Sequence, residues 1–192
     1  MAKRPLKALL RNNAAYSTGV STTWSLDKIG KHSIIIFLLM PAEVNANTRL
    51  NVTEVFDEMK SLVGIWKKEG GESPNFSVSY ELTANSSVLV ETWLHNGKKH
   101  SFTMYHLDNE NLMATHYCPQ GNQPRLVLTK SSTIHNLNFS FLDATNLVDL
   151  AGSHQYSLGF DFSKDVNKIL RRESYISEGT EDISEQHLVR SK

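Results

Sequence analysis

Cysteine is nearly absent from this 192-residue sequence, in which Cys118 is the single thiol. One cysteine excludes an internal disulfide framework and a zinc site built from several cysteines of one chain. The histidines supply no metal motif either. Of the eight in the chain, the seven that follow residue 46 lack a compact spacing such as His-x-Glu-x-x-His. The sequence therefore predicts no metal site and no required cofactor.

Basic charge is scarce over most of the chain. Residues 1–46 hold six Lys and Arg against two Asp and Glu, whereas residues 47–192 hold 14 against 18, a net charge of −4. Nucleic acids and anionic membranes are bound by surfaces of the opposite sign. We therefore expect no nucleic-acid partner for the acidic part of the chain.

A long apolar segment is also lacking, because the uninterrupted apolar run at residues 34–40 is far shorter than the roughly 20 residues that span a bilayer. Basic residues precede this run, and residues 44–46 resemble a small-x-small cleavage site. The pattern predicts a bacterial signal peptide over residues 1–46, with cleavage after Ala46. It predicts a periplasmic or secreted domain over residues 47–192, with no stable membrane insertion after cleavage. A buried strand is the alternative for the apolar run.

One helix is predicted, at residues 51–62. Val52, Val55, Phe56 and Met59 recur there at helical spacing, and Asn51 is placed to cap the first turn.

The rest of the chain is rich in β-branched and aromatic residues that alternate with polar ones and are separated by turn sequences such as Asn96-Gly97. The predicted strands are 62–69, 75–83, 87–95, 98–107, 111–117, 125–131, 134–143, 154–163, 168–177 and 180–190. Consecutive strands joined by short turns form an antiparallel meander. Because closing such a sheet on itself removes its exposed edges, the sequence predicts an all-β fold, an antiparallel up-and-down ten-stranded barrel with one short N-terminal helix. An open sandwich of two sheets is the alternative.

The segment Gly64-Ile65-Trp66, at the start of the first predicted strand, resembles the Gly-x-Trp opening of lipocalins and related calycin barrels. The segments 105–108 and 115–125 are similar to a tract found in a family of exported, lipocalin-like bacterial proteins. Pro119-Gln120 departs from that tract, where Ala-Ala is usual. The resemblance implies a calycin-type barrel without an established activity. It also implies that Arg190 stacks on Trp66, as a last-strand arginine does in lipocalins, so that Gly64, Trp66 and Arg190 are structural.

The stretch 115–125 ends one predicted strand and enters a loop that gathers an imidazole, the thiol, two carboxamides and a guanidinium. A concentration of polar and reactive side chains at a strand end is typical of a pocket mouth. A four-residue connection at 108–111 would pair Tyr105 with Ala114 and Thr103 with His116, with Cys118 on the same face. The candidate ligand-binding residues are Tyr105, His116, Cys118, Asn122, Gln123 and Arg125.

Each of these residues also has a structural interpretation. For Cys118, the interpretation as a small buried apolar residue is favoured over that as a nucleophile. Asn122, Gln123 and Arg125 are well suited to hydrogen bonding with the backbone of their own loop. We assign no catalytic residue.

The sequence favours an exported barrel that binds a small, partly apolar molecule. Three alternatives stay open: an enzyme that acts on a small ester or lipid through His116 with Cys118 or Tyr105, a solidly packed interaction module, and a haem protein by analogy with nitrobindin-like ten-stranded barrels. A cavity continuous with the loop would favour binding, and a carboxylate bonded to His116 would favour the enzyme.

Overall fold

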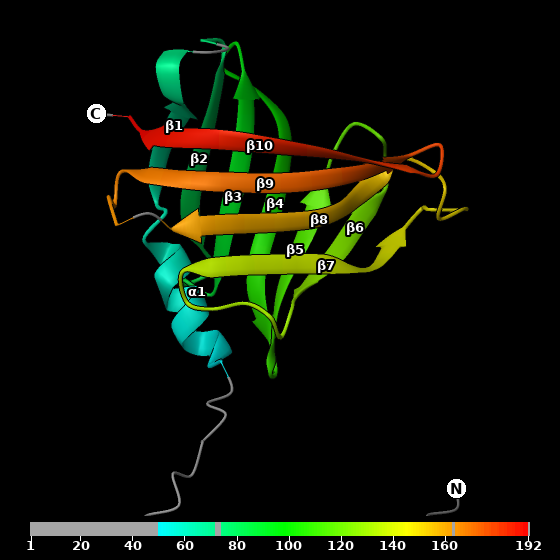
Figure 1. Cartoon of the computed structure of the whole chain (residues 1–192), viewed down its shortest axis with the longest axis horizontal. Helices are drawn as coiled ribbons and strands as arrows, with labels where there is room; N and C mark the ends of the chain where they lie inside the picture. The colour runs from blue at the N-terminus through cyan, green and yellow to red at the C-terminus, as the bar shows by residue number, and fades with distance from the viewer. Residues whose placement is uncertain (1–49, 72–73, 163, 192) are drawn as a thin grey trace, which may run out of the picture. The chain divides into compact units, whose positions relative to one another are not determined.

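The computed structural model describes residues 50–71, 74–162 and 164–191 (Figure 1). The predicted signal peptide lies outside the described residues. The elements, in chain order, are α1 (Val52–Lys60), β1 (Gly64–Lys68), the short 3₁₀ turn η1 (Glu69–Gly71), β2 (Phe76–Thr83), β3 (Val88–His95), β4 (Lys98–Asp108), β5 (Asn111–Tyr117), β6 (Gln123–Leu128), β7 (Asn136–Thr145), β8 (His154–Phe162), β9 (Lys168–Ser177) and β10 (Thr180–Arg190). No helix in this part of the chain is long and apolar enough to cross a membrane.

The ten strands form a closed antiparallel barrel in which each strand pairs with its neighbours in sequence and β1 pairs with β10. Figure 1 shows the strands wrapping around a common interior. The predicted up-and-down barrel is confirmed, and the open sandwich was the wrong alternative. Closure leaves no unpaired edge strand, which is the physical reason that a meander of this length curls back on itself.

Strand bounds differ most from the prediction around the β6–β7 connection. The predicted strand 125–131 ends instead at Leu128, because residues 129–132 form a turn in which Ser132 N–H donates to Thr129 O at 3.2 Å. The Ser132 hydroxyl also donates to Asn138 O at 3.2 Å. Hydroxyl side chains that bond nearby backbone compete with the strand ladder, and this ends β6 early.

Two hairpin turns follow from residues that accept a positive φ. Asn96 and Gly97 have φ values of 51° and 73°, and Glu178 and Gly179 have 51° and 76°. These values match the primed two-residue turns, whose twist suits antiparallel strands. The β4–β5 hairpin has the predicted register, with Thr103 opposite His116.

The helix begins at Val52, one residue later than predicted, with Asn51 as its cap. The Asn51 side chain accepts from Thr53 N–H at 3.0 Å and donates to the Glu54 carboxylate at 3.2 Å. The helix contacts β4 and β5. Its buried residues Val55, Phe56 and Met59 belong to the hydrophobic core of the barrel.

The barrel interior changes character from one layer of side chains to the next. Leu89, Tyr105 and Ala114 lie opposite one another on β3, β4 and β5 and are fully buried. The next layer along the same strands is Glu91, Thr103 and His116, which is equally buried but polar. Buried polar groups need partners, so this second layer marks where specific chemistry begins.

The seam between β1 and β10 is held by Arg190 on Trp66. The two residues are opposite in register, and the Arg190 guanidinium carbon lies 4.3 Å from the centroid of the indole ring. Arg190 Nη1 and Nη2 donate to Val63 O and Ser61 O at 2.6 and 2.7 Å. A Cβ at Gly64, where φ is 133°, would lie 2.9 Å from Arg190 Nη1. The predicted stacking is confirmed, and the glycine leaves the space that it needs.

Candidate functional site

One end of the barrel is hollowed by two adjoining cavities of about 500 and about 210 Å³. The larger is lined by β4, β5, β9 and the loop 118–120. His100, Ser101, His116 and Tyr175 line both cavities. The smaller adds Lys68, Phe76, Trp93, Glu173 and Gln186. Because the lining comes from seven of the ten strands, we call the two cavities together the mouth cavity.

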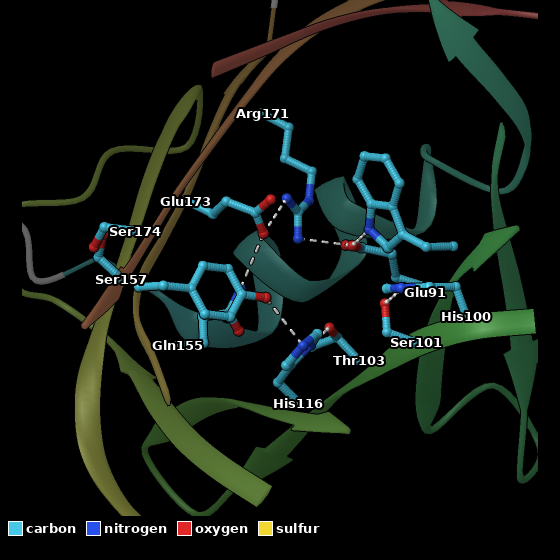
Figure 2. Close-up of polar contacts among 12 residues, drawn as sticks. Glu91, His100, Ser101, Thr103, His116, Gln155, Ser157, Arg171, Glu173 and Ser174 are labelled. Atoms are coloured by element: carbon cyan, nitrogen blue, oxygen red, sulfur yellow. Dashed lines mark hydrogen bonds and ion pairs between the residues drawn. The ribbon is translucent and has the colours of Figure 1, made fainter. Parts of the chain in front are cut away.

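His116 forms part of the floor of the mouth cavity and has two hydroxyl partners. Its Nδ1 lies 2.9 Å from Thr103 Oγ1, and its Nε2 lies 3.1 Å from the Tyr175 hydroxyl (Figure 2). Burial, reinforced by the positive charge of Arg171, lowers the pKa of His116 to about 4. Burial, and less strongly the nearby Glu173, raises the pKa of Tyr175 well above its usual range. Both groups are therefore neutral at pH 7, and the imidazole has one donor and one acceptor nitrogen.

A buried ion network lies behind this floor, centred on Arg171. Arg171 Nη2 is 2.8 Å from Glu91 Oε1, and Arg171 Nη1 is 2.8 Å from Glu173 Oε2. Figure 2 shows the guanidinium between the two carboxylates. Its carbon also lies 5.1 Å from the Trp93 ring centroid. Burial alone would lower the pKa of Arg171, but Glu173 and Glu91 outweigh it and raise this pKa well above its usual range.

Glu91 is fully buried and its carboxylate is well supplied with donors. Besides the contact with Arg171, it accepts from Trp93 Nε1 and from the Tyr105 hydroxyl, both at 2.6 Å. Burial and the adjacent Glu91 raise the pKa of Tyr105 well above its usual range. Such charge-assisted bonds compensate for the cost of burying the carboxylate.

Glu173 differs from Glu91 because it faces the mouth cavity. Its side chain is 17% exposed, and Oε2 accepts from Gln155 Nε2 at 3.2 Å as well as contacting Arg171. Within the described part of the chain, Oε1 has no hydrogen-bond partner. Burial opposes ionisation of Glu173, but the attraction of Arg171 prevails and lowers the pKa of Glu173.

His116 and Cys118 are the two predicted ligand-binding residues that line the mouth cavity. His116 is buried on the interior face, as predicted, whereas Cys118 lies beyond the end of β5 rather than on its face. The half-buried Cys118 thiol donates to the Gln120 side chain. Burial raises the pKa of this thiol, which is the opposite of what a nucleophilic cysteine requires.

Tyr105 was also predicted to bind ligand, but it lies deeper. Its hydroxyl is used by Glu91, and its ring packs against Phe139 and Phe160 with centroid distances of 6.0 Å to each. It lines neither cavity. The hydroxyl therefore belongs to the ion network, and the ring belongs to the hydrophobic core.

Asn122, Gln123 and Arg125 were also predicted to bind ligand, and they line neither cavity. Asn122 Nδ2 donates to Ser153 O at 2.7 Å, and Gln123 Nε2 donates to Gly121 O at 3.2 Å.

Arg125 forms an exposed ion pair with Asp143 on the outside of the barrel. Its neighbours Pro124 and Leu126 are buried, so strand alternation turns the arginine outward. Of the three residues, Gln123 bonds the backbone of its own loop, as the structural interpretation has it, whereas Asn122 bonds the backbone of residue 153 and Arg125 pairs with Asp143.

The residues that dominate the site, above all Arg171, Glu173 and Tyr175, were not predicted from the sequence. The sequence does indicate these positions, because residues 169, 171, 173 and 175 are every second residue of a correctly predicted strand and therefore lie on one face. The buried Ile169 shows that this face is inward. An arginine and a glutamate at consecutive inward positions predict a buried ion pair or a site, since such residues are rarely buried alone.

No protein-family model and no curated protein matches this sequence. Over the described residues, no group of three or more His, Cys, Asp and Glu side chains is arranged to hold a metal ion. Haem ligation by His116 does not fit the arrangement, since hydroxyl groups occupy both of its ring nitrogens.

Proposed function

We propose that this protein is an exported, lipocalin-like barrel that binds a small, partly apolar molecule in the mouth cavity. The observation that carries the proposal is the hollow of about 500 Å³, which is continuous with the loop 118–120 and has a polar floor at His116 and Tyr175. Ligand sites are typically concave, several hundred Å³ in volume, and lined by apolar groups with a few placed polar ones.

The surroundings of the cavity suit binding because they hold its walls in place. Thr103 and Tyr175 fix the His116 ring, and Arg171 joins Glu91 on β3 to Glu173 on β9. A site whose side chains are already ordered loses less entropy when a ligand enters.

Binding is better supported than catalysis. His116 has hydroxyl partners rather than a carboxylate, so no third group raises its basicity. The Cys118 thiol and the Tyr105 hydroxyl are each bonded to another residue. Neither is arranged as a nucleophile activated by His116.

The binding proposal is tested with Ser101→Trp, which adds a large ring where β4 lines both cavities. Native mass spectrometry of the purified protein would detect a co-purified molecule, and an environment-sensitive apolar dye would report an accessible cavity. We expect Ser101→Trp to abolish both signals. Ser140→Trp, on an exposed position of β7, is the matched control and should leave them unchanged. Dye binding that persists in Ser101→Trp would contradict the proposal.

The export proposal rests on the sequence of residues 1–46 and is tested separately. N-terminal sequencing of the protein recovered from the periplasm or medium of a bacterial host should give Asn47 as the first residue. A folded product that retains Met1 would contradict it.

A further inference from the structure

We propose that the mouth cavity selects organic cations, and that its ligand carries a protonated amine or amidine that binds the Glu173 carboxylate. This inference rests on the proposed binding function and adds the chemical class of the ligand.

The carboxylate of Glu173 has acceptor capacity that the described residues do not use. Glu91 contacts Arg171 and accepts from Trp93 and from Tyr105, and it lines neither cavity. Glu173 uses only Oε2, and the described residues offer no donor to Oε1. A carboxylate oxygen that faces a cavity and lacks a donor is placed to accept a charge-assisted hydrogen bond from a ligand.

The buried network holds more carboxylates than guanidinium groups. Two carboxylates, Glu91 and Glu173, share one guanidinium, Arg171. His116 adds no charge at pH 7, because its pKa is about 4. By formal charge the network is one positive charge short, and a largely buried carboxylate is costly unless an opposite charge compensates it.

Arg171 is not available to an anionic ligand. Its two terminal nitrogens contact the two carboxylates, its side chain is fully buried, and it lines neither cavity. Its Nε has no partner among the described residues, but this atom is buried as well. An anionic ligand in the mouth cavity would meet Glu173 and not the guanidinium.

Aromatic rings form part of the cavity wall that Glu173 also lines. Phe76, Trp93 and Tyr175 line the same small cavity as the carboxylate. Cations bind the faces of aromatic rings, and an apolar ligand body packs well against them.

Lys68 is the cation that lines this cavity, and its Nζ lies 5.9 Å from the Phe76 ring centroid. A ligand ammonium group would compete with it for the same aromatic surface and would be repelled by its charge. Removing the charge of Lys68 should therefore strengthen cation binding, whereas removing the charge of Glu173 should weaken it.

The test is isothermal titration calorimetry at pH 7.5 with three probes of nearly equal size: 2-phenylethylammonium, 2-phenylethanol and phenylacetate. We expect the ammonium to bind about tenfold more tightly than the alcohol, as a charge-assisted bond to an ionised acceptor implies, and the carboxylate to bind most weakly. Glu173→Gln should remove the preference for the ammonium and change alcohol binding less than about twofold. Lys68→Gln should increase the preference.

Glu181→Gln, at an exposed position of β10, is the matched control and should leave all three affinities unchanged. If all three probes bind wild type with equal affinity, or if phenylacetate binds best, cation selection is overturned and the binding function stands. If no probe binds at millimolar concentration, both proposals fail. The comparison of probes on wild type decides the question even if Glu173→Gln does not fold.

Discussion

The Tyr105 hydroxyl donates to the Glu91 carboxylate at 2.6 Å, across a diagonal between β4 and β3, while the ring of Tyr105 packs against Phe139 and Phe160. One side chain thus belongs to both the hydrophobic core and the buried ion network. The network behind the mouth cavity is therefore built into the core rather than added at its edge, and it should contribute to stability as well as to the shape of the cavity.

Tyr105→Phe tests this link. The substitution keeps the ring and removes one donor to a buried carboxylate, so we expect the free energy of unfolding to fall by about 1.5–3 kcal/mol. Urea denaturation followed by tryptophan fluorescence measures the change. Tyr156→Phe, at a ring that is 42% exposed, is the control and should cost less than about 0.5 kcal/mol. Equal costs for the two variants would show that the Tyr105 hydroxyl is not part of a stabilising network.

His116 should make the protein less stable in mild acid. The pKa of His116 is about 4 in the folded state, against an ordinary value of 6.5, because the ring is buried. As pH falls below about 6.5, the unfolded chain takes up this proton and the folded chain does not, so stability is lost down to about pH 4.

His116→Gln removes that titration, so between pH 7 and pH 5 wild type should lose about 2 kcal/mol more than this variant. Urea denaturation at the two pH values gives the comparison. His135→Gln, at an exposed histidine, should follow wild type. A wild type and a His116→Gln variant with the same pH dependence would mean that His116 is not held neutral by burial.

Arg190→Ala should destabilise the barrel without affecting the mouth cavity. The variant loses the stacking on Trp66 and two hydrogen bonds to the carbonyls of Ser61 and Val63. Together these are worth about 2–4 kcal/mol. Thermal denaturation should show a lower melting temperature, with probe affinity unchanged. Arg125→Ala, which removes an exposed ion pair with Asp143, should cost about 0–1 kcal/mol. A melting temperature that falls equally in both variants would contradict the seam argument.

Cys118 offers a probe of cavity occupancy. Its thiol is half-buried at the mouth cavity, and burial raises its pKa. At pH 8 a bulky, charged thiol reagent should therefore modify it at least about tenfold more slowly than free cysteine. Saturating 2-phenylethylammonium should slow the reaction further. If the thiol in the native protein reacts as fast as free cysteine, it lies outside the cavity.

The barrel was predictable because its signals are local. Alternating side chains, the Asn96-Gly97 turn and the two-residue connection at Asn109-Glu110 determine the strands and the β4–β5 register, and no long-range information is needed. The stacking of Arg190 on Trp66 followed from closure and from the lipocalin resemblance, since β10 must then meet β1.

The site was harder to predict because its residues come together only on closure. Glu91 and Arg171 are 80 positions apart in the sequence and meet across the interior, so neither signals its partner. The polar residues of the stretch 115–125 were predicted to bind ligand, but Gln123 bonds its own loop and Asn122 bonds the carbonyl of Ser153. His116 was predicted correctly to face the barrel interior, but its Tyr175 partner lies on a strand 59 positions later.

Binding of a ligand in the mouth cavity is tested most directly by a two-dimensional ¹H–¹⁵N NMR titration of the protein with 2-phenylethylammonium. We predict that the largest shifts occur at the backbone amides of His100, Ser101, His116, Glu173 and Tyr175, and that they saturate together with a single dissociation constant. Shifts that are absent there, or that spread over outward-facing positions such as Ser140 and Glu181, would contradict the account.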